Sequence, residues 1–199
     1  GVVGLSRASN ASFDLTNEAS ISAIAEELKA AGISFELIFD ATGALSIGSS
    51  GPEKSLPALD ADTMAKAFAI NVIGPVLLMK YFAPLLPTDG KCVFATLSAR
   101  VGSIGDNQLG GWYSYRASKA ALNQIVKTAA IEITRKRPDA ICLALHPGTV
   151  ETPLSQRYAR GQYTHNPREA ARKLLQTIDQ TGPEQTGSFL SFDGKTIPW

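Results

Sequence analysis

Short apolar runs alternate with longer amphipathic patterns along this chain of 199 residues. Runs rich in β-branched and aromatic residues predict β-strands, because such side chains suit a pleated surface. The predicted strands cover residues 2–5, 13–15, 35–39, 91–98, 140–146 and 187–192. Residues 91–98 and 140–146 are apolar almost throughout, which indicates strands that are covered on both faces.

Between these strands, apolar residues recur three and four positions apart, which predicts amphipathic helices. The first helix is expected between an N-cap at Thr16 and a stop at Gly32. The others are expected at about residues 62–81, 112–135 and 167–179. Because strands and helices alternate, we predict an α/β fold with a mostly parallel sheet. No repeat or linker divides the chain, so residues 1–199 are predicted to form one domain.

The composition excludes several classes of partner. The formal net charge is +1 and no basic run occurs, so we expect no nucleic acid and no anionic membrane surface. No segment is expected to reach the ~18 apolar residues of a membrane span. The opening residues read neither as a signal peptide nor as a transit peptide, which makes the cytoplasm the expected location.

The two cysteines, Cys92 and Cys142, lie in apolar strand-like runs. We predict that they are buried thiols rather than a disulfide or a metal site. Only two histidines accompany them, so no metal centre is expected.

Tyr115 and Lys119 stand four residues apart in a predicted helix, so both side chains project from the same face. An ammonium at that distance lowers the pKa of a phenol by stabilising the phenolate. A tyrosine tuned in this way can exchange a proton with a carbonyl oxygen near neutral pH. The pair alone is a weak signal, because both residue types are common on helix surfaces.

Four marks follow one another along the chain: Asp-Ala-Thr-Gly at 40–43, Asn-Val-Ile-Gly at 71–74, Tyr115-x-x-x-Lys119, and Pro-Gly-Thr-Val at 147–150. Their order and spacing resemble the short-chain dehydrogenase/reductase family. Residues 98–116 and the ending 192–199 most resemble its C-factor and sniffer-like carbonyl reductase branch. The resemblance covers nearly the whole chain and implies a Rossmann-type, doubly wound parallel sheet.

The resemblance also implies roles for individual residues. Tyr115 would be the general acid that protonates a carbonyl as hydride arrives. Lys119 would tune Tyr115 and bind the nicotinamide ribose, and Asn71 would hold a water in a proton relay. Cofactor contacts are implied at two turns that follow strands and at a threonine beyond them: Ala41, Thr42, Gly43, Pro147, Gly148, Thr149, Val150 and Thr152.

Arg7 stands where the family reads the adenosine ribose. An arginine there favours a 2′-phosphate through charge-assisted hydrogen bonds, so we expect NADP(H), with NAD(H) as the alternative. Asp14 and Leu15 resemble the pair that flanks the adenine ring.

The chain departs from the family pattern in two places. The strand, Gly-rich turn and helix that receive the pyrophosphate do not precede Gly1, and no Gly-x-x-x-Gly-x-Gly occurs elsewhere. There are three explanations: the chain is truncated, the sequence gives only the ordered residues, or the protein is a family member that lacks this pyrophosphate-binding segment. The second is favoured, because a sheet without its central strand would be unstable. The position expected to carry the catalytic serine hydroxyl is Ala99. Ser98 is the first candidate to supply this hydroxyl instead, and Ser103 is the second. The third possibility is a site that works without a serine.

The resemblance therefore implies an NADP(H)-dependent oxidoreductase that reduces a carbonyl or oxidises an alcohol of a small molecule. Trp112 is expected to line the substrate pocket, residues 151–166 to form a lid, and the long helices to build a homodimer or homotetramer. The alternative is a non-catalytic or signalling member that keeps the fold. Ala99 and the missing pyrophosphate-binding segment favour that alternative, whereas the retained Tyr115, Lys119 and Asn71 argue against it.

Overall fold

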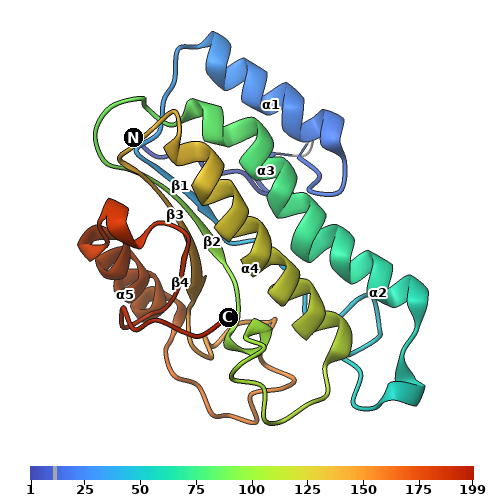
Figure 1. Ribbon diagram of the computed structural model, residues 1–199. Helices are drawn as coiled ribbons and strands as arrows, with labels where there is room; N and C mark the ends of the chain where they lie inside the picture. Colours follow the sequence, from blue (N-terminus) through green and yellow to red (C-terminus); the bar gives the residue numbers. More distant parts are fainter. Residues whose placement is uncertain (11–12) are drawn as a thin grey trace.

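The computed structural model describes residues 1–10 and 13–199 and has one parallel sheet at its centre (Figure 1). The strands are β1 (Leu37–Asp40), β2 (Cys92–Leu97), β3 (Ala140–His146) and β4 (Ser188–Ser191). Their order in the sheet, β1-β2-β3-β4, follows the order in the chain. Each neighbouring pair is parallel, and Val93 lies opposite Ile141 in the central register. The predicted α/β fold of Rossmann type, with a parallel sheet, is confirmed.

Helices cover both faces of this sheet. They are α1 (Glu18–Ala30), α2 (Ala61–Phe68), α3 (Gly74–Phe82), α4 (Tyr113–Thr134) and α5 (Pro167–Gln180). Figure 1 shows α1, α3 and α4 on one face and α5 on the other. Successive strand residues point to opposite faces, so two cores form. Phe94 packs in the core shared with α1, α3 and α4, and Leu143 packs in the core that contains Leu174 of α5.

The predicted strands at residues 2–5 and 13–15 are wrong. Val2 is 99% exposed, and no strand of the described chain pairs with residues 2–5. A strand needs a neighbour to satisfy its backbone groups, and an apolar pattern does not reveal whether that neighbour exists. Phe13 is instead buried in the core beside α1 and α3.

The helix termini differ from prediction at α1. Asn17, not Thr16, is the N-cap, because its Oδ1 accepts hydrogen bonds from the N–H groups of Ala19 and Ser20. Thr16 donates its hydroxyl hydrogen bond to Asp14 at 2.8 Å. Either residue type can cap a helix, so the sequence does not distinguish the two positions.

The helix predicted at 62–81 is present, but it is interrupted. A π-helical turn, Ala69–Ile73, joins α2 to α3. Such turns re-aim side chains within a helix and are frequent at functional sites. Asn71 lies in this turn with its side chain fully buried.

The segment Ala61–Leu85 is long and apolar enough to cross a membrane by length and composition, contrary to the expectation from the sequence. Half of its apolar window is buried inside the protein, where α2 and α3 contact α4 and α1. This is the position of a core helix.

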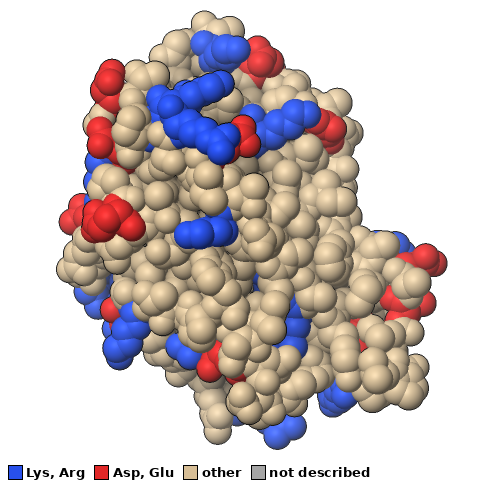
Figure 2. Space-filling model, viewed as in Figure 1, with Lys and Arg blue, Asp and Glu red and all other residues tan. Residues whose placement is uncertain are grey.

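Figure 2 shows Lys and Arg side chains gathered in the upper part of this face beside Asp and Glu side chains, and a few isolated Lys or Arg side chains nearer its centre. No extended surface of one sign covers this face. The expectation that nucleic acid is not a partner remains a prediction.

Cys92 and Cys142 are free and buried, as predicted. Burial raises the pKa of the Cys142 thiol to about 12, which keeps the thiol protonated and unreactive. Within residues 1–10 and 13–199, no three His, Cys, Asp or Glu side chains gather as a metal site would require.

Candidate active site

The carboxyl ends of the parallel strands and the start of α4 surround a cavity of about 900 Å³. The turn after β1, the residues after β2 and the turn after β3 form three of its walls. Tyr115 and Lys119, from the first turns of α4, form another. Ligands bind at this edge in open parallel sheets, because the loops there are free to vary while the strands hold them in place.

Burial is the main cause of the shifted pKa values of Tyr115 and Lys119. It raises the pKa of Tyr115 to about 12 and lowers the pKa of Lys119 to about 8, in the second case against the attraction of Asp40. Lys119 Nζ donates a hydrogen bond to the carbonyl oxygen of Leu97 at 2.8 Å. The expectation that the pKa of Tyr115 is lowered is therefore wrong for this structure. Desolvation disfavours both the Tyr115 phenolate and the Lys119 ammonium.

Asn71 joins the turn after β1 to α4. Its Oδ1 accepts from the Ala44 N–H at 2.8 Å, and its Nδ2 donates to the Ala44 carbonyl at 2.8 Å and to Ser118 Oγ at 3.1 Å. A Cβ at Gly43, where φ is +149°, would lie 3.3 Å from Lys119 Nζ and 3.4 Å from Asn71 Oδ1. Asn71 and Lys119 therefore both lie next to Gly43. A side chain at position 43 would displace one or both of them.

Asp40 is a site residue that the sequence reasoning did not assign. Its carboxylate is buried and accepts hydrogen bonds from the Thr42 N–H at 2.8 Å and the Thr96 hydroxyl at 2.6 Å. The carboxylate thereby shapes the turn 41–43 and raises the pKa of Lys119 against the effect of burial. The signal was available: an acidic residue directly after an apolar strand is expected to have a buried partner.

Neither candidate serine has a free hydroxyl. Ser98 donates to Asn123 Oδ1 at 2.6 Å, and both residues are buried. Ser103 donates to the Pro198 carbonyl at 2.5 Å and lies outside the cavity lining. The cavity is lined by Ser98 and by Ala99, whose side chain at the expected serine position is a methyl group.

Aromatic side chains stand beside Tyr115. The Trp112 ring lies 6.3 Å from the Tyr115 ring and 5.6 Å from the Tyr158 ring, both in edge-to-face geometry. Trp112 lines the cavity, as expected of a pocket residue. Its backbone is left-handed, with φ of 54°, which turns the chain sharply into α4.

The turn after β3 forms another wall of the cavity. It consists of Pro147, Gly148, Thr149 and Val150, and with Thr152 it lines the cavity. His146, just before it, also lines the cavity and was not assigned from the sequence. Burial, and next to it Arg100, lower the pKa of His146 to about 4, so the imidazole is neutral at physiological pH. Its Nδ1 accepts from the Arg100 N–H at 3.3 Å.

Residues 151–166, the lid segment, contain no helix or strand and contribute side chains to the cavity. The Glu151 N–H donates to the His165 carbonyl at 3.0 Å, which ties the two ends together. In the middle, the Tyr158 hydroxyl lies 2.7 Å from Ser46 Oγ. Movement of this segment stays a prediction.

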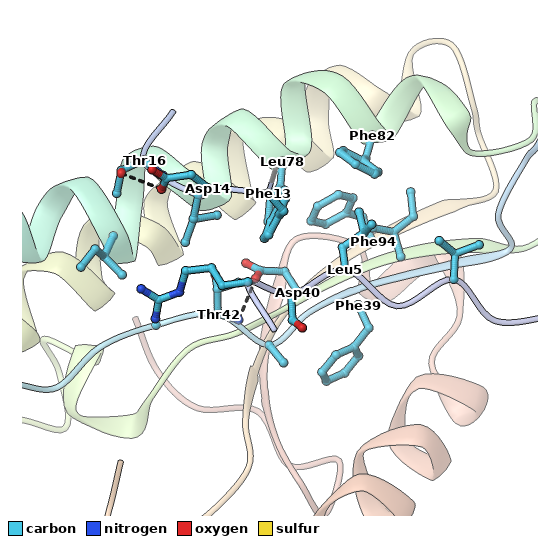
Figure 3. A pocket seen from close by; sticks show the side chains of 18 of the residues that line it. Leu5, Phe13, Asp14, Thr16, Phe39, Asp40, Thr42, Leu78, Phe82 and Phe94 are labelled. Carbon is cyan, nitrogen blue, oxygen red and sulfur yellow. Dashed lines mark hydrogen bonds between the residues drawn. The ribbon is translucent and has the colours of Figure 1, made fainter. Parts of the chain in front are cut away.

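A second cavity of about 1010 Å³ shares the turn 41–43 with the first. Figure 3 shows Asp14 and Thr16 on one side of it and Asp40 and Thr42 on the other. Arg7 and Leu15 line it too. Hydrogen bonds from Thr16, with a contribution from the charge of Arg7, lower the pKa of the exposed Asp14. The predicted adenosine-end residues therefore gather in this cavity, apart from Tyr115 and Lys119.

The chain matches the family described as enoyl-(acyl carrier protein) reductase over residues 4–194. With its parallel sheet and its Tyr-Lys helix, it belongs to the short-chain dehydrogenase/reductase family, as the sequence resemblance predicted. The 1-hydroxy-2-glutathionyl-2-methyl-3-butene dehydrogenase of Rhodococcus sp. (strain AD45) is 33% identical over 94% of this chain and 78% of its own length.

Two further relatives bear on function. The C-signal protein of Myxococcus xanthus is 34% identical over 76% of this chain and 88% of its own length, which supports the predicted C-factor resemblance. The NADPH-bound carbonyl reductase from chicken fatty liver has a TM-score of 0.78 and 27% identity, over 94% of this chain and 75% of that one. The relatives place this chain among dehydrogenases and reductases.

Proposed function

We propose that this protein is an NADP(H)-dependent oxidoreductase that reduces a carbonyl group of a small molecule, or oxidises the corresponding alcohol. The observation that carries the proposal is the pair of half-buried Tyr115 and buried Lys119 in one wall of a cavity at the carboxyl edge of the sheet. Residues that titrate abnormally in a cleft are candidates for acid–base chemistry. The dehydrogenase from Rhodococcus and the carbonyl reductase from chicken support the same class of reaction.

The residues present fit a nicotinamide cofactor. The Thr42 hydroxyl is buried without a hydrogen-bond partner in the wall that both cavities share, so a polar ligand group would satisfy it. Gly43 leaves the space beside Lys119 free of a side chain. The turn 41–43, the turn 147–150 and Thr152 would hold the nicotinamide end, and Asp14 and Leu15 would hold the adenine. When bound, the cofactor supplies the hydride.

The charge state of Tyr115 favours the direction of reduction. With a pKa of about 12, the phenol keeps its proton at neutral pH and can donate it to the oxygen of a carbonyl group whose carbon takes up hydride. Lys119, with a pKa of about 8, can lose and regain a proton near neutrality and so can restore the phenol. Asn71 fixes the turn 41–44 against α4 and thereby holds Lys119 in place.

No serine hydroxyl takes part in this proposal. Ser98 and Ser103 hold other parts of the protein together, and Tyr115 acts as the only proton donor to the substrate oxygen. Trp112 and Tyr158 form an aromatic wall beside that donor, and the lid segment closes over it.

The 2′-phosphate of NADP(H) is assigned to Arg7, because the guanidinium lines the cavity beside Asp14. NAD(H) is the alternative, since it needs no cation there. Fluorescence titration with NADPH and with NADH tests this choice. Tight binding of NADPH alone supports it, equal binding of both refutes the preference for NADP(H), and binding of neither refutes the cofactor.

A non-catalytic, signalling role is the second candidate. The likeness to the C-signal protein and the methyl group of Ala99 at the expected serine position favour it. Turnover of NADPH with a panel of aldehydes and ketones would refute it. Binding of NADPH without turnover of any of them would favour it.

For assembly, we propose a homodimer or homotetramer in the cytoplasm, built through the outer surfaces of α2–α3 and α4. Ile73 and Ile131 are 54% and 53% exposed there. Light scattering of the purified protein gives the mass directly, and a monomer at micromolar concentration would contradict the proposal.

A further inference from the structure

Glu53 holds the start of the helix that carries Tyr115. α4 has no side-chain cap of its own, because its N-cap residue is Trp112. The carboxylate of Glu53, which lies in the loop between β1 and α2, supplies the missing acceptors. Its Oε2 accepts from the Ser114 N–H at 3.1 Å, and its Oε1 accepts from the Ser114 hydroxyl.

The main chain of Glu53 adds a third bond. The Trp112 N–H donates to the Glu53 carbonyl oxygen at 2.5 Å. Glu53 therefore binds the residue before the helix and the second residue within it, on either side of Tyr113. Tyr115 follows Ser114 directly, so its backbone position depends on this attachment.

The carboxylate is buried and ionised. Glu53 is 7% exposed, and its burial raises its pKa, but hydrogen bonds from Ser114 and from its own amide outweigh this, so its pKa is lowered. A carboxylate at the positive end of a helix is a favourable arrangement. Ser114 is also buried, so its N–H and its hydroxyl lose a protein acceptor at a buried position if Glu53 is removed.

Arg116 adds further hydrogen bonds to the same turn. Its Nε donates to the Gly110 and Gly111 carbonyls and its Nη1 to the Val101 carbonyl. Glu53 and Arg116 thus both bind the turn that leads to Trp112 and Tyr115.

We propose that Glu53 is a positioning residue for Tyr115: it acts through Ser114 and Trp112 and does not touch the substrate. This inference rests on the proposed function, in which Tyr115 is the proton donor. Without Glu53 the first turn of α4 loses its fixed acceptors, and the phenol moves relative to the cavity. A displacement of about 1 Å costs on the order of 100-fold in rate.

The test compares Glu53→Ala, Glu53→Gln and the control Asn17→Ala. Asn17 caps α1, which carries no site residue, so its removal also costs a helix cap. Turnover is measured per folded molecule with NADPH and an aromatic aldehyde. We expect Glu53→Ala to lower kcat about 10- to 100-fold with little change in KM for NADPH. Glu53→Gln, which retains a carbonyl acceptor, recovers part of kcat, and Asn17→Ala leaves kcat unchanged.

A second readout does not need turnover. The chain has two tryptophans, so Trp199→Phe leaves Trp112 as the only fluorescent indole. In that background we expect Glu53→Ala to shift Trp112 emission to the red and to increase its quenching by acrylamide, whereas Asn17→Ala does neither. If the parent protein shows no turnover, the proposed function fails, and Trp112 fluorescence alone decides on Glu53. Unchanged kcat in Glu53→Ala, or unchanged Trp112 fluorescence, would overturn the inference.

Discussion

Lys119 donates a hydrogen bond from Nζ to the backbone carbonyl of Leu97 at 2.8 Å, which ties the helix of the candidate site to the end of β2. An ammonium carries three donor hydrogens, and this one bond replaces only part of the hydration lost on burial. The cost of burying the charge is the reason why the pKa of Lys119 falls to about 8.

This pKa predicts a dependence of stability on pH. The ordinary pKa of lysine, 10.5, applies to the unfolded chain, so between pH 8 and 10.5 the unfolded state binds a proton that the folded state does not. Stability due to Lys119 therefore rises with pH across that window, by on the order of 3 kcal/mol at most. We expect urea unfolding at pH 7.5 and pH 10 to show this rise relative to Lys119→Met. An equal stability difference at both pH values would contradict the buried state of the amine.

Asp40 is predicted to set the pKa of Lys119. Its negative charge favours the ammonium, so Asp40→Asn should lower the pKa of Lys119 further below 8. The Thr96 hydroxyl can accept from an asparagine amide, which keeps the local hydrogen bonding. The measurement is the pH at which the stability difference from the matching Lys119→Met variant begins to change. Asp62→Asn, an exposed carboxylate on α2, is the control and should leave that pH unchanged.

Two variants test whether a serine hydroxyl takes part in catalysis. Ser98→Ala leaves Asn123 Oδ1 buried without a donor, so it should cost about 1–3 kcal/mol of stability while turnover per folded molecule stays the same. Ala99→Ser places a hydroxyl in the cavity wall and should raise kcat, because it adds a donor to the substrate oxygen. Loss of turnover in Ser98→Ala at full folding would show that Ser98 is catalytic after all.

Arg7 is predicted to distinguish the two nicotinamide cofactors. Arg7→Ala removes a charge-assisted hydrogen bond of about 1.5–3 kcal/mol, so the Kd for NADPH should rise about 10- to 100-fold. The Kd for NADH should change little. Arg135→Ala, an exposed arginine at the end of α4, controls for net charge. Parallel changes in both Kd values would mean that Arg7 does not contact the 2′-phosphate.

The sequence predicts the parts of this fold that depend on local pattern. Residues 140–146 are recognisable as a buried strand because seven consecutive positions suit a strand covered on both faces, and β3 has those bounds. Residues 2–5 have the same apolar character but form no strand, because pairing depends on a neighbour elsewhere in the chain. The π-helical turn at Asn71 likewise places that side chain in hydrogen bonds with Ala44 and Ser118, and the sequence alone reveals neither the turn nor these partners.

In the candidate site, too, the sequence identifies residues that belong to local motifs but not residues that tertiary contacts bring there. Tyr115, Lys119 and the turns after β1 and β3 carry compact motifs, so the sequence identifies them. Glu53 reaches the site from a distant loop through hydrogen bonds to Ser114 and Trp112, and Tyr158 through a ring contact with Trp112. No local pattern in the sequence indicates those contacts. The sequence does not indicate the raised pKa of Tyr115, because the spacing shows that Lys119 is near but not how far the surrounding protein desolvates the two groups.

Tyr115→Phe, assayed for NADPH-dependent turnover and titrated with NADPH in parallel, tests whether Tyr115 is the proton donor. The substitution removes only the phenolic oxygen and keeps the ring in contact with Trp112. We predict that turnover falls by at least about 100-fold while the Kd for NADPH stays within about 3-fold of the parent protein. Turnover retained at the level of the parent protein would contradict Tyr115 as the proton donor and, with it, the proposed mechanism.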